Sequence, residues 1–224
     1  ETAALYAALK QLQADERNIV TIEDPVEYAV EGIGQSQVNT KVGFTFAEGL
    51  RTILRQDPNT VMVGEIRDAE TAGIAVTAAL GSNLVLSSLH TNDAAGAVTR
   101  LRDLGVEVFA LAATLRGVIA QRLVRRLCPE CRRPEPATTA QAGLVDIAPG
   151  TPVMAPTGCD ACGGQGWHGR IGMFEVLRVD ETVRALIYGG GDEAAIAAAA
   201  GRNGLTLAAA ARQLVLDGVT TPEE

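Results

Sequence analysis

Two pairs of cysteines lie in the second half of the sequence, Cys128-Pro-Glu-Cys131 and Cys159-Asp-Ala-Cys162. Each C-x₂-C turn offers two sulfur atoms to one metal ion, and two such turns are typical of a tetrahedral zinc site. We expect that site to be structural, because four thiolates would leave no position for a substrate. Reduced thiols without metal are the alternative. We expect the nearby His168 to lie in a loop rather than to bind the metal.

A second group of polar residues follows apolar stretches that are typical of buried strands. Ligands of open parallel sheets bind outside the carboxyl ends of the strands, where a carboxylate can orient water or help to hold Mg²⁺. Each residue taken singly also fits a simpler interpretation, a solvated carboxylate or a satisfied histidine at a strand end. The stretches are Asn18–Ile22 before Glu23-Asp24, Thr60–Val63 before Gly64-Glu65, and Leu84–Leu89 before His90.

These strands need helices between them, and the sequence supplies apolar and Ala-rich segments of suitable length. We predict helices at about 1–10, 45–56, 68–80, 93–104 and 108–126, and a loop with room for a short hairpin at 24–44. Alternation of apolar strands with helices indicates an α/β fold with a parallel sheet. After Leu127 the chain is Pro-rich, and from Gly172 onward we predict helices again, including 193–200 and 205–216.

Composition places the chain among globular proteins, with 224 residues, 47% hydrophobic and 21% charged. The net charge of −8 argues against a generic nucleic-acid binder. One basic run is either a solvated helix end leading into a loop or a docking surface for an acidic partner or membrane phospholipid. It consists of Arg122, Arg125, Arg126, Arg132 and Arg133.

No stretch of the sequence reaches the roughly 18 apolar residues of a membrane span, and no signal peptide opens it. We therefore expect a cytosolic protein whose contact with a membrane is peripheral. In that compartment disulfides are the less frequent use of four cysteines, which favours the metal site.

The segment Leu54–Ala72, LRQDPNTVMVGEIRDAETA, resembles the Walker B region of the GspE/PulE/PilB-type ATPases of type II secretion and type IV pilus assembly. Three further segments resemble that family in order and spacing. They are Asn18–Tyr28 (its Asp box), Leu84–Asp93 (its His box) and the two cysteine pairs (its tetracysteine element). The resemblance covers nearly the whole chain.

The resemblance implies an ATP site that works with Mg²⁺. Glu65 would be the catalytic carboxylate that polarises the attacking water, and His90 would sense or position the γ-phosphate. Glu23, Asp24 and Glu27 would organise Mg²⁺ and water in the same cleft. Arg67 would belong to this nucleotide site, and we expect it to form with Asp68 an ion pair between motifs or a contact between subunits.

The family also implies an architecture and partners. The fold would be an incomplete RecA-like P-loop NTPase core at 1–127, a zinc-binding insertion at 128–170 and a small helical C-terminal region at 171–224. The parent protein would be a homo-hexamer at the cytoplasmic face of the inner membrane. Its partners would be the membrane platform and cytoplasmic docking proteins of a secretion or pilus machine, with no nucleic acid.

The sequence departs from the family's pattern at two places. No phosphate-binding Gly-x₄-Gly-Lys-Ser/Thr motif occurs, and Glu1 falls near the position of its lysine. The His box would begin Thr-Gly-His but here reads Gly81-Ser82-Asn83, and Asn83 cannot take a charge. We expect a C-terminal fragment, trimmed at both ends, of a protein that is active only with its phosphate-binding loop.

Two other interpretations stay open. A RecA-like motor acting on DNA would share the ATPase motifs, although it would favour a basic channel over an acidic chain. A degenerate homologue without the phosphate-binding loop would be a non-catalytic, zinc-containing assembly module. The motifs do not distinguish secretion from pilus extension or DNA uptake.

Overall fold

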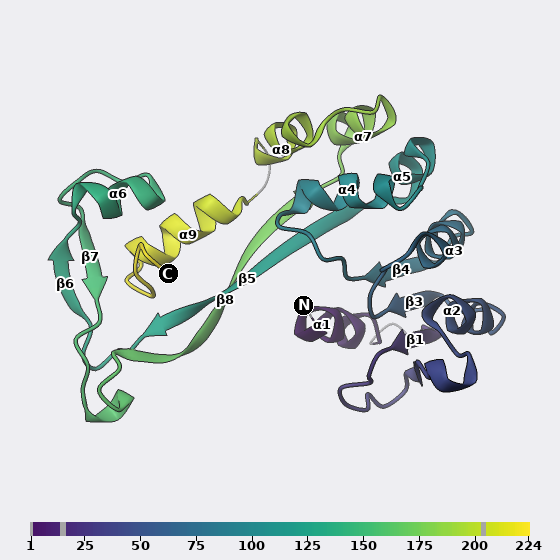
Figure 1. Cartoon of the computed structure of the whole chain (residues 1–224), viewed down its shortest axis with the longest axis horizontal. Coiled ribbons are helices and arrows are strands. Elements are labelled where there is room, and N and C mark those ends of the chain that lie inside the picture. Colours follow the sequence, from purple (N-terminus) through teal and green to yellow (C-terminus); the bar gives the residue numbers. More distant parts are fainter. Residues whose placement is uncertain (1, 14–16, 203–204) are drawn as a thin grey trace. The chain divides into compact units, whose positions relative to one another are not determined.

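The computed structural model describes residues 2–13, 17–202 and 205–224. The chain forms two compact units (Figure 1), the first of Glu1–Arg116 with Val179–Ala199 and the second of Gly117–Arg178 with Ala200–Glu224. These limits differ from the three segments that we predicted with ends at 127 and 170. The chain leaves the first unit at residue 116 and returns to it at 179.

The first unit contains a four-stranded sheet in the order β2-β1-β3-β4, with every neighbouring pair parallel. Its strands are β1 (Ile19–Glu23), β2 (Gly34–Gln37), β3 (Thr60–Val63) and β4 (Leu84–Ser87). All residues of β1 and β3 are buried, as expected for central strands of a parallel sheet. The predicted α/β fold with a parallel sheet is confirmed.

Helix α1 (Thr2–Gln13) packs on one face of this sheet through a buried cluster of Tyr6, Leu9, Ile19, Val30 and Met62. Helices α2 (Phe46–Leu54) and α3 (Ala69–Leu80) lie on the opposite side (Figure 1). Side chains alternate between the two faces of a strand, so Glu23 shares the α1 side with Ile19, while Ile22 faces α2.

The other helices of the first unit are α4 (Ala94–Asp103), α5 (Val108–Thr114), α7 (Glu181–Tyr188) and α8 (Glu193–Gly201). Side chains join them across long sequence distances. Arg102 donates to the carbonyl oxygens of Ile187 and Gly191, and Arg184 donates to that of Ala112. The chain segment that returns at Val179 is therefore an integral part of this unit.

The second unit is built on a long antiparallel ribbon of β5 (Gly117–Leu127) and β8 (Trp167–Arg178). A second antiparallel pair, β6 (Arg133–Pro136) and β7 (Pro152–Ala155), flanks helix α6 (Thr139–Val145). Helix α9 (Leu207–Leu216) closes a small core in which Val215 packs with side chains of α6 and β7. The short 3-10 helix η2 (Asp160–Cys162) carries the second cysteine pair.

Our prediction of one helix over 108–126 is wrong beyond Thr114, and residues 172–178, which we also predicted as helical, belong to β8. Gly117 is a weak helix former, and β-branched Val118, Ile119 and Val124 fit a strand once β8 pairs with it. The loop at 24–44 holds the parallel strand β2, the 3-10 helix η1 (Thr40–Val42) and one antiparallel bridge between Asn39 and Phe44.

The predicted basic run therefore belongs to β5, the turn after it and the first residue of β6, not to a helix end. Arg125 and Arg132 are held by side-chain contacts within the second unit. Arg125 pairs with Glu224 at 2.6 Å and lies over the ring of Trp167, and Arg132 donates to the carbonyl oxygen of Gly218. In the described part of the chain, no helix has the length and apolar character needed to span a membrane.

Candidate functional site

The carboxyl ends of β1, β3 and β4 lie side by side, because the register pairs Ile22 with Val63 and Val63 with Ser87. Backbone contacts extend this alignment past the strands. The Gly64 N–H donates to the Ile22 carbonyl oxygen, and the Ile66 N–H donates to that of Ser88. The segments after the three strands are thus held together before any side chain of the site is considered.

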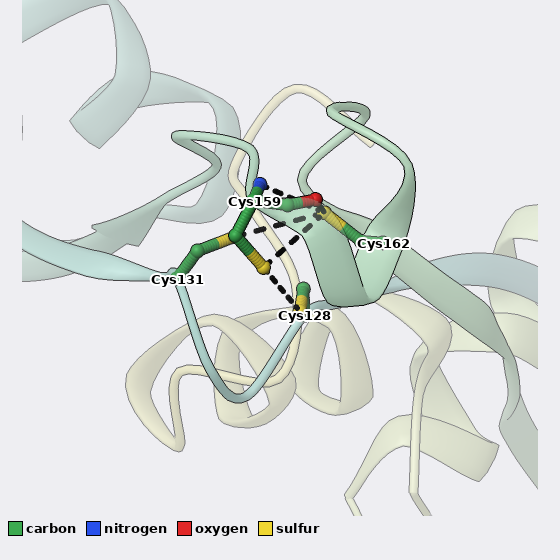
Figure 2. Close-up of side chains that lie close together, drawn as sticks. All are labelled: Cys128, Cys131, Cys159 and Cys162. Atoms are coloured by element: carbon green, nitrogen blue, oxygen red, sulfur yellow. Dashed lines mark hydrogen bonds between the residues drawn. The ribbon is translucent and has the colours of Figure 1, made fainter.

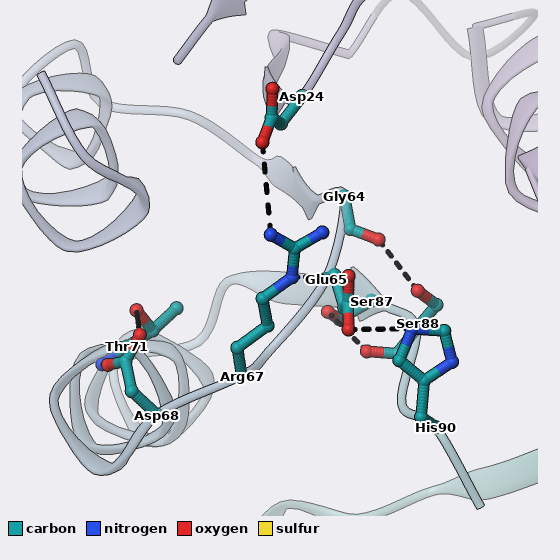
Figure 3. Close-up of polar contacts among 9 residues, drawn as sticks. All are labelled: Asp24, Gly64, Glu65, Arg67, Asp68, Thr71, Ser87, Ser88 and His90. Atoms are coloured by element: carbon teal, nitrogen blue, oxygen red, sulfur yellow. Dashed lines mark hydrogen bonds and ion pairs between the residues drawn. The ribbon is translucent and has the colours of Figure 1, made fainter. Parts of the chain in front are cut away.

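Glu65 stands at the centre of this edge (Figure 3). Its Oε2 accepts a hydrogen bond from Arg67 Nε at 2.6 Å, and its Oε1 lies 2.9 Å from His90 Nε2. The Glu65 side chain is 13% exposed, whereas those of Arg67 and His90 are 56% and 77% exposed. The structure therefore joins the predicted Walker B and His box residues through one sheltered carboxylate.

Arg67 links this carboxylate to the end of β1. Its Nη1 lies 3.9 Å from Asp24 Oδ2, and its Cζ lies over the ring of Phe46, 5.9 Å from the ring centroid. The hydrogen bond to Glu65 raises the pKa of Arg67, and the negative charges of Glu65 and Asp24 raise it further. Arg67 is thus fixed by residues from three separate segments.

Asp68, which we considered as the partner of Arg67, caps α3 instead: its Oδ1 accepts from the Thr71 N–H at 2.8 Å. Asp93 caps α4 in the same way, accepting from the Gly96 N–H. An aspartate at the N-cap starts each helix immediately after the site segment that precedes it. These caps fix where the segments bearing Glu65 and His90 end.

Glu23 has surroundings unlike those of Glu65. It is 3% exposed, and its carboxylate accepts from the hydroxyl of Tyr6, from Thr21 Oγ1 at 2.5 Å and from Gln35 Nε2 at 3.1 Å. Sequence reasoning missed these partners. The spacing of Tyr6 and Leu9 on one face of α1 indicates that Tyr6 is buried, but no local signal identifies Glu23 as its hydrogen-bond acceptor.

Three other predicted positions lie apart from this cluster. Glu27 is exposed in the loop after β1, and within the described residues its carboxylate forms no ion pair with the cluster. Asn83 lies at the opposite, amino end of β4, where its Nδ2 donates to the Pro58 carbonyl oxygen at 2.6 Å. Glu1 lies outside the described residues.

The four cysteines converge from two turns (Figure 2), and their sulfur atoms all lie within 4.8 Å of one another. Three of the sulfur–sulfur distances, from Cys128 to Cys159, from Cys131 to Cys162 and from Cys159 to Cys162, are 3.9, 3.9 and 3.8 Å. A disulfide bond would need about 2.05 Å. The cysteines are therefore unbridged thiols in a compact, tetrahedron-like group.

Backbone N–H groups are directed at this cluster. Cys162 Sγ accepts from the N–H groups of Cys159 and Gly166 at 3.2 and 3.1 Å. Gly166 has φ of +77°, and a Cβ there would lie 2.5 Å from Pro156 Cβ, so only glycine fits the turn. Burial raises the pKa of Cys159 to about 11. Burial also acts to raise that of Cys162, but the backbone donors outweigh it and lower the pKa to about 6.

His168 is not part of the cysteine cluster. We predicted a loop residue, but His168 lies at the beginning of β8, directly after Trp167. Among the described residues, the four cysteines alone form the group with metal-ligand spacing.

A profile of the family described as Type II/IV secretion system protein matches residues 1–224. Type II secretion system protein E of Klebsiella pneumoniae is 55% identical over 224 residues, which are 100% of this chain and 45% of that protein. The type IV pilus assembly ATPase PilB of Thermus thermophilus is 47% identical over 98% of this chain and 25% of its own length. The chain thus spans less than half of each of these relatives.

Among solved structures, the pilus retraction motor PilT with bound ADP aligns with a TM-score of 0.68 and 26% identity. The alignment covers 92% of this chain and 51% of PilT. It supports the α/β fold over almost the whole described chain.

Proposed function

The chain belongs to the Type II/IV secretion system protein family, and we propose that it is part of an ATPase that powers type II protein secretion or type IV pilus assembly. The single observation that carries the proposal is the position of Glu65. It is a sheltered carboxylate at the end of a buried strand, held between a guanidinium and an imidazole at the edge where parallel sheets bind ligands.

In this proposal Glu65 orients the water that attacks the terminal phosphate of ATP. A carboxylate in this role accepts a hydrogen bond from the water and aligns it with the phosphorus atom. Arg67 and His90 each contact one Glu65 oxygen, so they fix the rotamer of the carboxylate. Both side chains are largely exposed, and a small rotation would let either donate to a phosphate oxygen instead.

The donor set at this edge fits magnesium, which prefers carboxylate oxygens and water. Asp24 and Glu65 supply such oxygens from the ends of neighbouring strands, linked by Arg67. The oxygens of Glu23 already accept three protein hydrogen bonds, so Glu23 would act through water rather than directly. Magnesium, when bound, would neutralise charge on the phosphates of the substrate.

ATP hydrolysis by the longer protein that carries this sequence is the test. We expect Glu65→Gln to lower kcat by at least about 100-fold with little change in KM for ATP, because an amide cannot polarise the water. Glu70→Gln is the matched control, since Glu70 is an exposed residue of α3 that pairs with Arg51. Equal activity of the two variants would contradict the role of Glu65.

The 224-residue chain alone should hydrolyse ATP negligibly, because its sequence contains no Gly-x₄-Gly-Lys-Ser/Thr loop to hold the phosphates. Robust turnover by the purified chain would contradict this expectation. It would also require another phosphate-binding element within these residues.

The cysteine cluster is, in this proposal, a structural zinc site. A tetrahedral site with Zn–S bonds of about 2.3 Å has sulfur–sulfur edges of about 3.8 Å, which is close to the separations of 3.8 and 3.9 Å. Four thiolates suit zinc, and N–H groups directed at sulfur stabilise their negative charge. The metal would fasten the turn after β5 to the turn before β8.

By analogy with its relatives, we further propose that the longer protein works as a homo-hexamer on the cytoplasmic side of the inner membrane. Its partners would be the platform and docking proteins of a secretion or pilus machine. The names of the protein E and PilB relatives support the assignment to a secretion or pilus machine, whereas the hexamer and the membrane location rest on the family resemblance. Light scattering of the longer protein with ATP would test the hexamer, and a monomer under all conditions would contradict it.

A further inference from the structure

The hydroxyl of Tyr6 lies at the centre of a polar network that joins α1 to the end of β1 and to β2. Tyr6 is 1% exposed and belongs to α1, while its hydrogen-bond acceptor Glu23 ends β1, 17 residues later. The same hydroxyl accepts from the Glu27 N–H at 3.2 Å and from Gln35 Nε2 at 3.3 Å. Helix α1, strand β1 and strand β2 therefore meet at one oxygen atom.

The direction of each hydrogen bond follows from the number of protons available. The N–H of Glu27 and the amide nitrogen of Gln35 can only donate, so the single proton of the Tyr6 hydroxyl is directed to Glu23. Gln35 is itself oriented, because its Oε1 accepts from the Val30 N–H at 2.7 Å. The two protons of Gln35 Nε2 are shared among the Tyr6 hydroxyl, Glu23 and the Tyr28 carbonyl oxygen, and Glu23 is the terminal acceptor of the network.

Glu23 is a buried carboxylate held by neutral donors. Its partners are two hydroxyls and one amide, and within the described residues no basic side chain forms an ion pair with it. A buried carboxylate depends on such donors for its hydrogen bonds and for a single rotamer, because little water reaches it. Losing a donor would therefore change Glu23 more than it would change a solvated side chain.

We propose that Tyr6 is a positioning residue for the ATPase reaction: it holds the Glu23 carboxylate at the end of β1 and couples its orientation to helix α1. This proposal rests on the proposed function, since Glu23 would act on water at the same sheet edge as Glu65. Tyr6 itself is buried and is not assigned a contact with substrate. Burial raises the pKa of Tyr6, and the hydrogen bond to Glu23 raises it further, so the hydroxyl keeps its proton at neutral pH.

The contact itself can be tested without any activity, by NMR of the 224-residue chain with ¹³Cζ-labelled tyrosine at neutral pH. The Tyr6 signal, assigned by its loss in Tyr6→Phe, should shift in Glu23→Gln. It should stay in place in Glu27→Gln, because Glu27 meets Tyr6 only through its backbone. A Tyr6 signal that moves in neither variant, or equally in both, would overturn the contact.

The catalytic consequence needs the longer protein and a matched pair of variants, Tyr6→Phe and Tyr28→Phe. Each variant removes the hydroxyl of one tyrosine, and the centroids of the two rings are 4.5 Å apart, but only the Tyr6 hydroxyl donates to Glu23. We expect Tyr6→Phe to lower kcat about 10- to 100-fold with KM for ATP within about twofold, the range found when a partner behind an active group is removed. Tyr28→Phe should keep the wild-type values.

A second variant, Gln35→Met, tests the positioning of Glu23 independently of Tyr6. Gln35→Met removes a second donor to Glu23 and should lower kcat in the same direction as Tyr6→Phe. Tyr6→Phe and Tyr28→Phe proteins with equal kcat would refute positioning by Tyr6, and so would a change confined to KM. If the wild-type longer protein hydrolyses no ATP, the proposed function is wrong, and the NMR comparison still decides whether Tyr6 holds Glu23.

Discussion

Replacing Cys131 with serine should remove zinc from the second unit. Cys131 is 3% exposed, and its Sγ lies 3.9 Å from that of Cys162. Serine offers a harder oxygen, which zinc in a thiolate site binds less well than sulfur. Structural zinc sites have apparent binding free energies of about 10–16 kcal/mol at pH 7, or about 2.5–4 kcal/mol for each of four ligands. One lost ligand therefore corresponds to about 10²- to 10³-fold weaker binding.

The measurement is zinc per chain by elemental analysis, before and after dialysis against a chelator of known affinity. The wild-type chain should retain one zinc per chain under conditions in which Cys131→Ser loses it. Thermal unfolding should show the same ranking, since metal binding free energy contributes directly to the stability of the folded unit.

His168→Ala is the matched control for this experiment. His168 follows the second cysteine pair closely in the sequence but lies outside the group with metal-ligand spacing. Its variant should keep equimolar zinc with wild-type affinity. Absence of zinc from freshly purified wild-type protein, or equal retention by Cys131→Ser, would refute the assignment of four thiolate ligands.

Two stability predictions concern other parts of the chain. The Gly49→Ala variant (α2) should be about 1–3 kcal/mol less stable than the Gly73→Ala variant (α3). Both substitutions raise helix propensity. A Cβ at position 49, however, would lie 2.6 Å from Ile22 Cδ1, whereas a Cβ at position 73 would meet nothing within 4 Å. Equal free energies of unfolding by urea would contradict this packing. Glu224→Gln should lower Tm by no more than about 3 °C at pH 7, because Arg125 lowers the pKa of Glu224. Because the pKa of Glu224 is lowered in the folded chain, the ion pair adds stability at pH values above the unfolded pKa of about 4.3, and this stability is lost as pH falls through the folded pKa. The difference in Tm between wild type and Glu224→Gln should therefore vanish near pH 3. A difference in Tm that stays constant with pH would exclude the ion pair.

The sequence alone predicts which residues meet at the carboxyl edge of the parallel sheet, because the local signals there agree. Apolar runs mark β1, β3 and β4, and polar residues follow each of them, so parallel pairing alone brings Asp24, Glu65 and His90 to one edge. Asp68 and Asp93 fit the predicted helix starts for the same local reason, the preference of aspartate for the N-cap.

Long-range pairing explains what sequence reasoning missed. Residues 117–127 carry no strong preference by themselves, and they form a strand because β8, some 50 residues later in the chain, supplies their hydrogen bonds. Strand β2, with the sequence Gly-Gln-Ser-Gln, has no apolar pattern at all and forms at the sheet edge beside β1. Two of the three partners of Glu23, Tyr6 and Gln35, come from α1 and β2, so no local pattern could reveal them.

Glu23 and Glu65, the two carboxylates at neighbouring strand ends, have different surroundings, and this difference argues that they have different roles. Glu65 contacts a guanidinium and an imidazole that are mostly exposed and therefore free to change partners. Glu23 contacts two buried hydroxyls and one partly buried amide, which α1, β1 and β2 hold in place. Groups with such different environments commonly take different roles in one reaction. Under the function proposed above, Glu65 would be the group that responds to the nucleotide, and Glu23 would be a fixed acceptor whose orientation depends on Tyr6.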